Sequence, residues 1–183
     1  MFKVSHFSFA VIAALLCLTS VSPSYAEVRV AVIGDSNVYG KGVSTDDNYV
    51  TQLASRLKAK GLDVSVSNGG RNGDTTGGLL ARLDSAAPQG TQVAVVWVGI
   101  NDQRSLGASK EQVQAGRAAI AQRLKARGIE VITLVGSQFT PLHQNPATSL
   151  ADHHLNRQGY SQVVARTLPQ VEAAVRRAQG KGK

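Results

Sequence analysis

The chain has 183 residues and a formal net charge of +8 at pH 7, with 20 Lys and Arg against 12 Asp and Glu. Its basic residues are scattered, except in the segment 176–183 (RRAQGKGK), and aromatic residues make up 5% of the chain. Because a nucleic-acid-binding surface needs clustered basic side chains with aromatics among them, we expect no nucleic-acid partner. The length fits one domain with its own core.

The first 26 residues have the layout of a secretory signal peptide. Lys3 precedes an apolar stretch at 7–18, and the segment closes with Ser24-Tyr25-Ala26. This order of basic, apolar and small residues predicts cleavage after Ala26. The apolar stretch is shorter than the roughly 20 residues of a membrane span, so an uncleaved anchor is the weaker alternative.

The chain after cleavage is predicted to be a single domain over 27–183, with 177–183 as a frayed basic tail. Cys17 is the only cysteine, and the bulky Leu16 before it argues against a lipid anchor at that position. Since Cys17 leaves with the signal peptide, the exported domain is expected to fold without disulfides and to depend on burial for its stability. We expect it to be periplasmic or secreted, with no stable membrane insertion after cleavage.

Three short apolar runs, rich in β-branched residues, lie at 28–33, 92–99 and 129–135. They mostly lack the alternation of a half-buried strand and are typical of parallel strands that are covered on both faces. A weaker run at 62–68 alternates between apolar and polar residues and is a further strand candidate.

Helical spacing of apolar residues is found between and after these runs, at 47–60, at 109–127 and from Asn156 onward. Ser109 and Gln112 resemble a capping box, and Asn156 is a good N-cap. Pro169 is expected to kink the last helix or to restart it. Alternating strands and helices within one domain predict an α/β fold whose parallel sheet is covered on both sides.

Polar segments follow the strand candidates. They are Gly34-Asp35-Ser36-Asn37, the glycine-rich 68–78, Gly99-Ile100-Asn101-Asp102 and, before the last helix, 151–160. In open α/β sheets the ligand crevice lies outside the carboxyl ends of the strands. The four segments therefore bring a serine, a glycine-rich backbone, an asparagine amide and an Asp/His cluster to one edge of the sheet.

Acyl transfer requires this set of parts. A serine hydroxyl needs an imidazole within hydrogen-bond reach to take its proton, and a carboxylate should orient that imidazole. The tetrahedral intermediate needs fixed N–H donors around its oxyanion, and N–H groups of a glycine turn or an asparagine amide can supply them.

The four segments resemble the four sequence blocks of the SGNH (GDSL-type) hydrolases, which are serine esterases and lipases with a flavodoxin-like, three-layer α/β/α fold. GDSN resembles the serine block, NGDTTGGLLARLD the glycine block, GIND the G-x-N-D block and DHHLNRQGY the last block. The blocks follow the family's order over nearly all of 28–178. The resemblance implies a parallel sheet of four or five strands and an activity without metal or organic cofactor.

The resemblance also implies roles for individual residues. Ser36 would be the nucleophile, His154 the general base and Asp152 the carboxylate that orients it. The N–H groups of Ser36 and Gly73, with the side chain of Asn101, would form the oxyanion hole.

Asp35 and Asn37 flank the serine, and we expect them to support its turn. Each motif also has a simpler interpretation, with the serine in an ordinary turn, Gly73 present for a positive φ angle, and Asn101 closing a turn. A zinc site is a further alternative that no helix-spaced ligand pair supports, and its ligands would be His143, His153, His154 and Asp152.

Two features depart from the family pattern. Asp152 is two residues before His154 where the family has three, and Ala151 occupies the usual position of the acid. Either Asp152 reaches His154 through a shifted loop, or the base works without a well-placed carboxylate, or His153 is the base in a reorganised loop. The segment 136–151 is short, so we expect the fifth strand to be missing or vestigial.

The function expected from these motifs is that of an exported serine esterase acting on carboxylic esters or thioesters, similar to GDSL-type esterases, lipases, acyl-thioesterases or lysophospholipases. Its substrate would be a small-molecule or polysaccharide-linked acyl ester. A rival from another class is a non-catalytic envelope glycan-binding module on the same scaffold, which the displaced Asp152 favours.

Export predicts a defined mature N-terminus. Protein recovered from the periplasm or medium of a bacterial host should begin at Glu27, because signal peptidases cleave after small residues such as Ala26. N-terminal sequencing measures this, and Ala26→Leu should block the cleavage. Recovery of the wild-type chain with Met1 retained would contradict the prediction.

Overall fold

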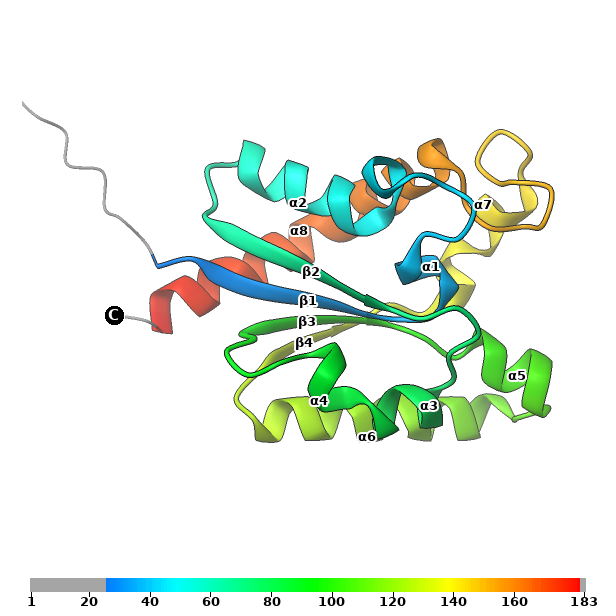
Figure 1. The fold of residues 1–183 in the computed structure, drawn as a ribbon, viewed down its shortest axis with the longest axis horizontal. Coiled ribbons are helices and arrows are strands. Elements are labelled where there is room, and N and C mark those ends of the chain that lie inside the picture. Colours follow the sequence, from blue (N-terminus) through cyan, green and yellow to red (C-terminus); the bar gives the residue numbers. More distant parts are fainter. Residues whose placement is uncertain (1–25, 182–183) are drawn as a thin grey trace, which may run out of the picture.

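A computed structural model describes residues 26–181 of the chain (Figure 1). The predicted signal peptide therefore lies outside the described residues, apart from Ala26. Within the described range, no helix is long and apolar enough to cross a membrane.

Four parallel strands form the sheet of the described chain, in the spatial order β2-β1-β3-β4. Their bounds are β1 Val28–Gly34, β2 Val64–Gly70, β3 Val93–Trp97 and β4 Glu130–Thr133. The predicted parallel sheet is confirmed, with four strands rather than five in this part of the chain. In the short segment 136–151, which was expected to lack a full fifth strand, the chain forms the 3-10 turn η2 (Gly136–Phe139) and the short helix α7 (Thr140–Gln144).

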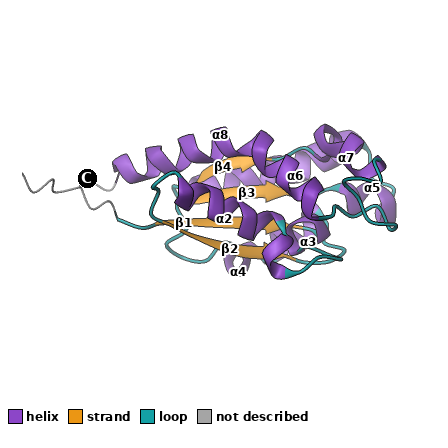
Figure 2. Ribbon diagram, turned by 90° about the horizontal axis from the view of Figure 1, so that it is seen from above, coloured by secondary structure: helices purple, strands orange, loops and turns teal. Residues whose placement is uncertain are grey.

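Helices cover both faces of the sheet, which gives the predicted three layers (Figure 1). One face carries α2 (Tyr49–Ala59) and α8 (Arg157–Lys181), and the other carries α3 (Thr76–Ala81), α4 (Leu83–Ala86) and α6 (Lys110–Ala126). The short elements α1 (Ser36–Tyr39) and α5 (Ile100–Leu106) begin just after β1 and β3, and α5 and α7 lie at the same end of the molecule (Figure 2).

The central strands are buried on both faces because successive side chains enter different cores. Val30, Val32 and Trp97 pack with α2 and α8, whereas Ala31 and Val96 pack with residues of α3, α4 and α6. This accounts for the nearly continuous apolar sequence of β1 and β3. The edge strand β2 is mostly exposed or half-buried beyond its first residue, in line with its weaker pattern.

The predicted helix caps are largely found. Ser109 and Gln112 form a capping box at α6, and the Asn156 side chain accepts the Gly159 N–H at the start of α8. Helix α2 starts later than expected, because the side chain of Asn48 caps it by accepting the Thr51 N–H.

Two expectations for the last helix are corrected. Pro169 lies within the continuous helix α8, so the helix does not restart there. Pro169 and Ala165, whose carbonyl loses its usual helix partner, are both exposed, so water can bond to that carbonyl. Residues 177–181 continue α8 instead of forming a frayed tail, because Ala178 is buried and Arg177 pairs with Glu130.

Candidate active site

Ser36 is the first residue of α1, directly after the end of β1. Gly34 pairs with Trp97 of β3, and a Cβ atom at Gly34 would overlap the Trp97 carbonyl oxygen. The next residue, Asp35, donates its backbone N–H to that same oxygen at 3.2 Å. Its side chain caps α1 by accepting the Asn37 N–H at 2.9 Å. The glycine therefore allows the close strand contact that fixes where the serine begins its helix.

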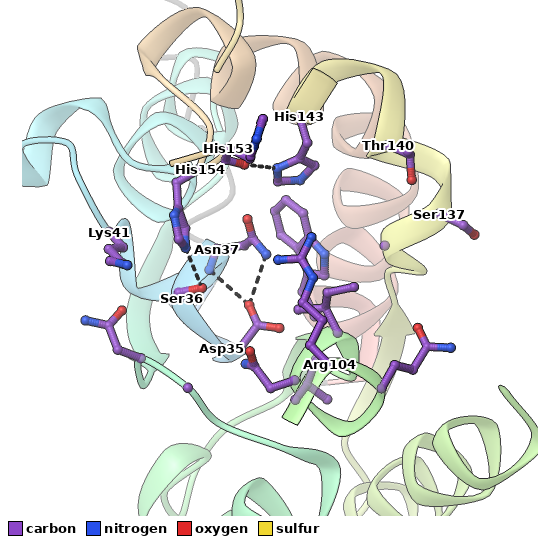
Figure 3. Close-up of a pocket in the computed structure, with 18 of the residues that line it drawn as sticks. Asp35, Ser36, Asn37, Lys41, Arg104, Ser137, Thr140, His143, His153 and His154 are labelled. Carbon is purple, nitrogen blue, oxygen red and sulfur yellow. Dashed lines mark hydrogen bonds between the residues drawn. The ribbon is translucent and has the colours of Figure 1, made fainter. Parts of the chain in front are cut away.

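The His154 ring points toward Ser36 and lies next to it in the cavity (Figure 3). The distance between His154 Nε2 and Ser36 Oγ is 3.0 Å, and the two residues are 118 positions apart in the sequence. With a neutral imidazole, the serine hydroxyl donates to Nε2, which leaves the ring proton on Nδ1. The structure therefore places His154, and not its neighbour His153, within hydrogen-bond reach of the serine.

Asp152 lies on the other side of the His154 ring. Its Oδ2 is 2.9 Å from His154 Nδ1, a distance at which the carboxylate can pair with the ring. Asp152 Oδ1 also accepts the backbone N–H of His154 at 3.2 Å, and Oδ2 lies 3.5 Å from Lys41 Nζ. The backbone N–H of His154 is the largest cause that holds the pKa of Asp152 below its usual value.

A three-residue turn brings Asp152 behind His154 despite the shortened spacing. Ser149 and Leu155 form an antiparallel bridge, and the Leu150 N–H donates to the His154 carbonyl at 2.7 Å. The His153 N–H donates back to the Leu150 carbonyl at 2.9 Å, and His153 has a φ of +62°. A hairpin of this length is expected to end in a residue with left-handed backbone. The left-handed residue reverses the chain between Asp152 and His154, which is the shifted loop that the sequence left as one of three options.

The proposed oxyanion donors line the same cavity as Ser36. Gly73 has a φ of +74° in the turn after β2, and neither its N–H nor that of Ser36 donates to another group of the described chain. The Asn101 amide donates to the Asp74 carbonyl at 2.8 Å. Since an amide carries two N–H groups, one of them stays available for a ligand.

Arg82, whose role no sequence motif predicts, holds the glycine turn against the sheet. Its Nε and Nη2 donate to Asp74 Oδ2 at 2.8 and 2.6 Å, and Nη2 also donates to the carbonyls of Gly34 and Gly69. Both side chains are largely buried, with 15% and 4% exposure. The one signal for this role in the sequence was the position of Arg82 in the glycine block, eight residues after Asp74. The helix α3 between them brings the Arg82 side chain back to the loop that contains Asp74.

A second buried contact joins this loop to the start of α5. The Asp102 carboxylate accepts the backbone N–H and the hydroxyl of Thr76. Because Asn101 precedes Asp102, this contact fixes the position of the Asn101 amide beside the glycine turn. The GIND motif thus supplies both an amide for the cavity and the carboxylate that anchors it.

The cavity has a volume of about 610 Å³ and lies at the carboxyl ends of the strands (Figure 3). Its lining includes the basic side chains of Lys41, Arg104 and Arg117. The carboxylates of Asp35 and Asp152 also line it. Arg104 extends from α5 into the cavity (Figure 3). No cluster of three or more metal-binding side chains is found among residues 26–181, so the zinc ligand set weighed from the sequence does not assemble there.

A serine, an imidazole and a carboxylate in series form the arrangement shared by serine hydrolases, and in this chain they lie at the edge of a parallel sheet. A family model described as the GDSL-like lipase/acylhydrolase family matches residues 32–179. The chain therefore belongs to this family.

Individual relatives agree with this assignment. Esterase TesA of Pseudomonas aeruginosa is 34% identical over 127 residues, which cover 69% of this chain and 62% of that protein. The chain thus spans less than two thirds of the length of that relative. An arylesterase of Vibrio mimicus is 27% identical over 145 residues, which cover 75% of this chain and 71% of that protein. A crystal structure of TesA shares the fold, with a TM-score of 0.71 at 23% identity over 80% of this chain and 99% of the other.

Asp35 is a buried carboxyl beside the serine, with 1% exposure. Burial raises its pKa to about 6, and the hydrogen bonds from Asn37 offset part of this increase. The folded chain therefore binds the Asp35 proton more tightly than the unfolded chain. Between about pH 4 and pH 6, the folded state keeps a proton that the unfolded state has lost, so this group's contribution to stability falls as pH rises.

Asp35→Asn should remove this pH dependence while keeping a side-chain oxygen for the Asn37 N–H. The free energy of unfolding of the wild type, relative to the variant, should fall by about 2 kcal/mol from pH 4 to pH 7. Urea unfolding of both proteins at a series of pH values measures this difference. The contributions of the other titrating groups are common to both proteins and cancel in the subtraction. A difference that is constant with pH, or that rises, would refute the assignment.

Proposed function

We propose that the chain is an exported serine esterase that hydrolyses a carboxylic ester or thioester through an acyl-enzyme on Ser36. The single observation that carries this proposal is the 3.0 Å distance between His154 Nε2 and Ser36 Oγ. A general base needs this reach to take the serine proton. Family membership and the relatives named esterase and arylesterase support the same activity. The signal-peptide pattern of residues 1–26 supports export to the periplasm or medium.

In the proposed first half-reaction, Ser36 Oγ attacks the acyl carbonyl carbon and His154 Nε2 takes the hydroxyl proton. The negative oxygen of the tetrahedral intermediate accepts N–H groups from Ser36, Gly73 and Asn101. His154 then gives its proton to the departing alcohol or thiol, which leaves the acyl group on Ser36. Asp152 stabilises the positive charge on the imidazole in these steps.

In the second half-reaction, water enters the cavity and His154 takes one of its protons as the oxygen attacks the acyl-serine. Collapse of the second intermediate releases the acid, and His154 returns the proton to Ser36. The proposed steps use only residues of this chain, the ester substrate and water.

Ser36→Ala and His154→Ala should each lower kcat for p-nitrophenyl acetate by about 10⁴-fold or more, because nucleophile and base act as one unit. A fluorophosphonate probe should label the wild type at Ser36 and should not label Ser36→Ala. Ser44→Ala, an exposed serine that bonds to Asp47, is the matched control and should keep wild-type kcat. A panel of esters from acetyl to palmitoyl, with acetylated xylan, assigns the acyl length.

The rival glycan-binding module makes opposite predictions for the same experiment. A folded wild type without turnover on the panel and without a fluorophosphonate adduct would overturn the esterase proposal and favour binding alone.

Asp152→Asn should have a smaller effect than loss of the base. The carboxylate is 49% exposed, so solvent screens its field at the imidazole. We expect kcat to fall by about 10- to 100-fold, compared with about 10⁴-fold for the buried acid of a well-aligned triad. Steady-state kinetics on p-nitrophenyl acetate measures the ratio, and a loss equal to that of His154→Ala would show that Asp152 is fully coupled to the base.

A further inference from the structure

His143 bonds to the turn that carries both Asp152 and His154. Its Nδ1 lies 2.8 Å from the His153 carbonyl oxygen, from a position in α7 that is ten residues earlier in the chain (Figure 3). A carbonyl can only accept, so Nδ1 must carry the proton and donate it. Burial is the main cause that lowers the pKa of His143 from its usual value, which favours the neutral ring.

The residue that receives this bond is the strained position of the turn. Among the described residues, His153 is the one non-glycine residue with a positive φ, at +62°. Backbone of this kind is unfavourable for a residue with a Cβ atom, and it persists only when surrounding contacts hold it. Because the shortened Asp-x-His spacing needs that conformation, whatever holds His153 also sets the positions of its two neighbours.

The backbone next to His143 is anchored in the core. Leu142 is 4% exposed and packs in the core with α8, and its carbonyl accepts the hydroxyl of the buried Thr148 at 2.7 Å. At the far end of the turn, Leu155 is fully buried. Two other side chains from distant segments of the described chain also bond to residues of the turn: Ser36 to His154, and Lys41 through an exposed pair with Asp152.

We propose that His143 is a positioning residue that holds the left-handed His153 through its carbonyl and thereby keeps His154 at the Ser36 hydroxyl. This inference rests on the proposed function, since its catalytic consequence requires Ser36 and His154 to act as nucleophile and base. His143 itself transfers no proton in this scheme. Its contribution is to fix the geometry of the base, where an error of about 1 Å costs on the order of 100-fold in rate.

Three variants at this position separate the hydrogen bond from the volume of the ring. His143→Asn places an amide N–H near the position of Nδ1 and should keep the bond. His143→Gln places its amide one bond farther out, and His143→Ala removes the donor. Gln138→Ala, an exposed residue of η2 in the same segment, is the matched control.

Two measurements apply to each variant. Hydrogen exchange over residues 149–155 reports whether the turn is held and does not depend on activity. We expect faster exchange in His143→Ala and His143→Gln, and wild-type exchange in His143→Asn and Gln138→Ala. With p-nitrophenyl acetate, kcat should fall about 10- to 100-fold in the first two variants with KM within about twofold, and His143→Asn should recover most of the rate.

The outcomes separate this inference from the proposed function. Wild-type exchange in His143→Gln, equal losses in the Asn and Gln variants, or fast exchange with unchanged kcat would each overturn the role of His143. If His143→Ala does not fold, the contrast between Asn and Gln decides. An inactive wild type would overturn the proposed function instead, while the exchange contrast would still decide whether His143 holds the turn.

Discussion

The buried ion pair of Arg82 and Asp74 is the interaction on which the arrangement of the cavity depends. Through one guanidinium, the carbonyl ends of β1 and β2 and the carboxylate of the glycine turn are held together. The Asp74 carbonyl in turn receives the Asn101 amide, so the loops after three different strands share one hydrogen-bonded frame. Removing one member of such a pair would leave a buried charge without a partner, which is far more costly than losing a surface pair.

The serine half and the imidazole half of the site are built differently. Ser36 follows a central strand that is paired on both sides, and its position is set by the contact of Gly34 with Trp97. His154 lies in a hairpin outside the sheet, whose conformation depends on local hydrogen bonds and on His143. The nucleophile is therefore placed by the pairing of the sheet itself, whereas the base is held by a small number of contacts that single substitutions can remove.

The sequence predicted the sheet and the residues at its carboxyl edge because strand burial and helix spacing leave a periodic signal. The run at 28–33 put Ser36 at the carboxyl end of a strand, but the three later polar segments were needed to distinguish it from an ordinary turn residue. The capping box at Ser109 marked the start of α6. Arg82 and His143 were missed because their roles come from contacts between segments that no local pattern encodes. The position of Asp152 was left open because a single backbone angle, at His153, decides whether a two-residue spacing brings a carboxylate behind an imidazole. Whether Pro169 would kink the last helix or restart it was left open, and α8 continues through it because burial of the helix face that contains Thr167 and Val171 outweighs one lost hydrogen bond.

The sheet ends at β4, and a 3-10 turn with a short helix stands where a further strand was expected to be missing or vestigial. A strand at that place would have a fixed length and register, because every residue would pair with β4. The segment between β4 and α8 is tied down instead at Phe139, Leu142 and Leu155, which are buried. Between β4 and Phe139, insertions or deletions would leave the ladder of the sheet unchanged, so this part of the cavity wall can vary in length without altering the strand that presents the serine. The part between Leu142 and Leu155 cannot vary in the same way, because it carries His143 and His154.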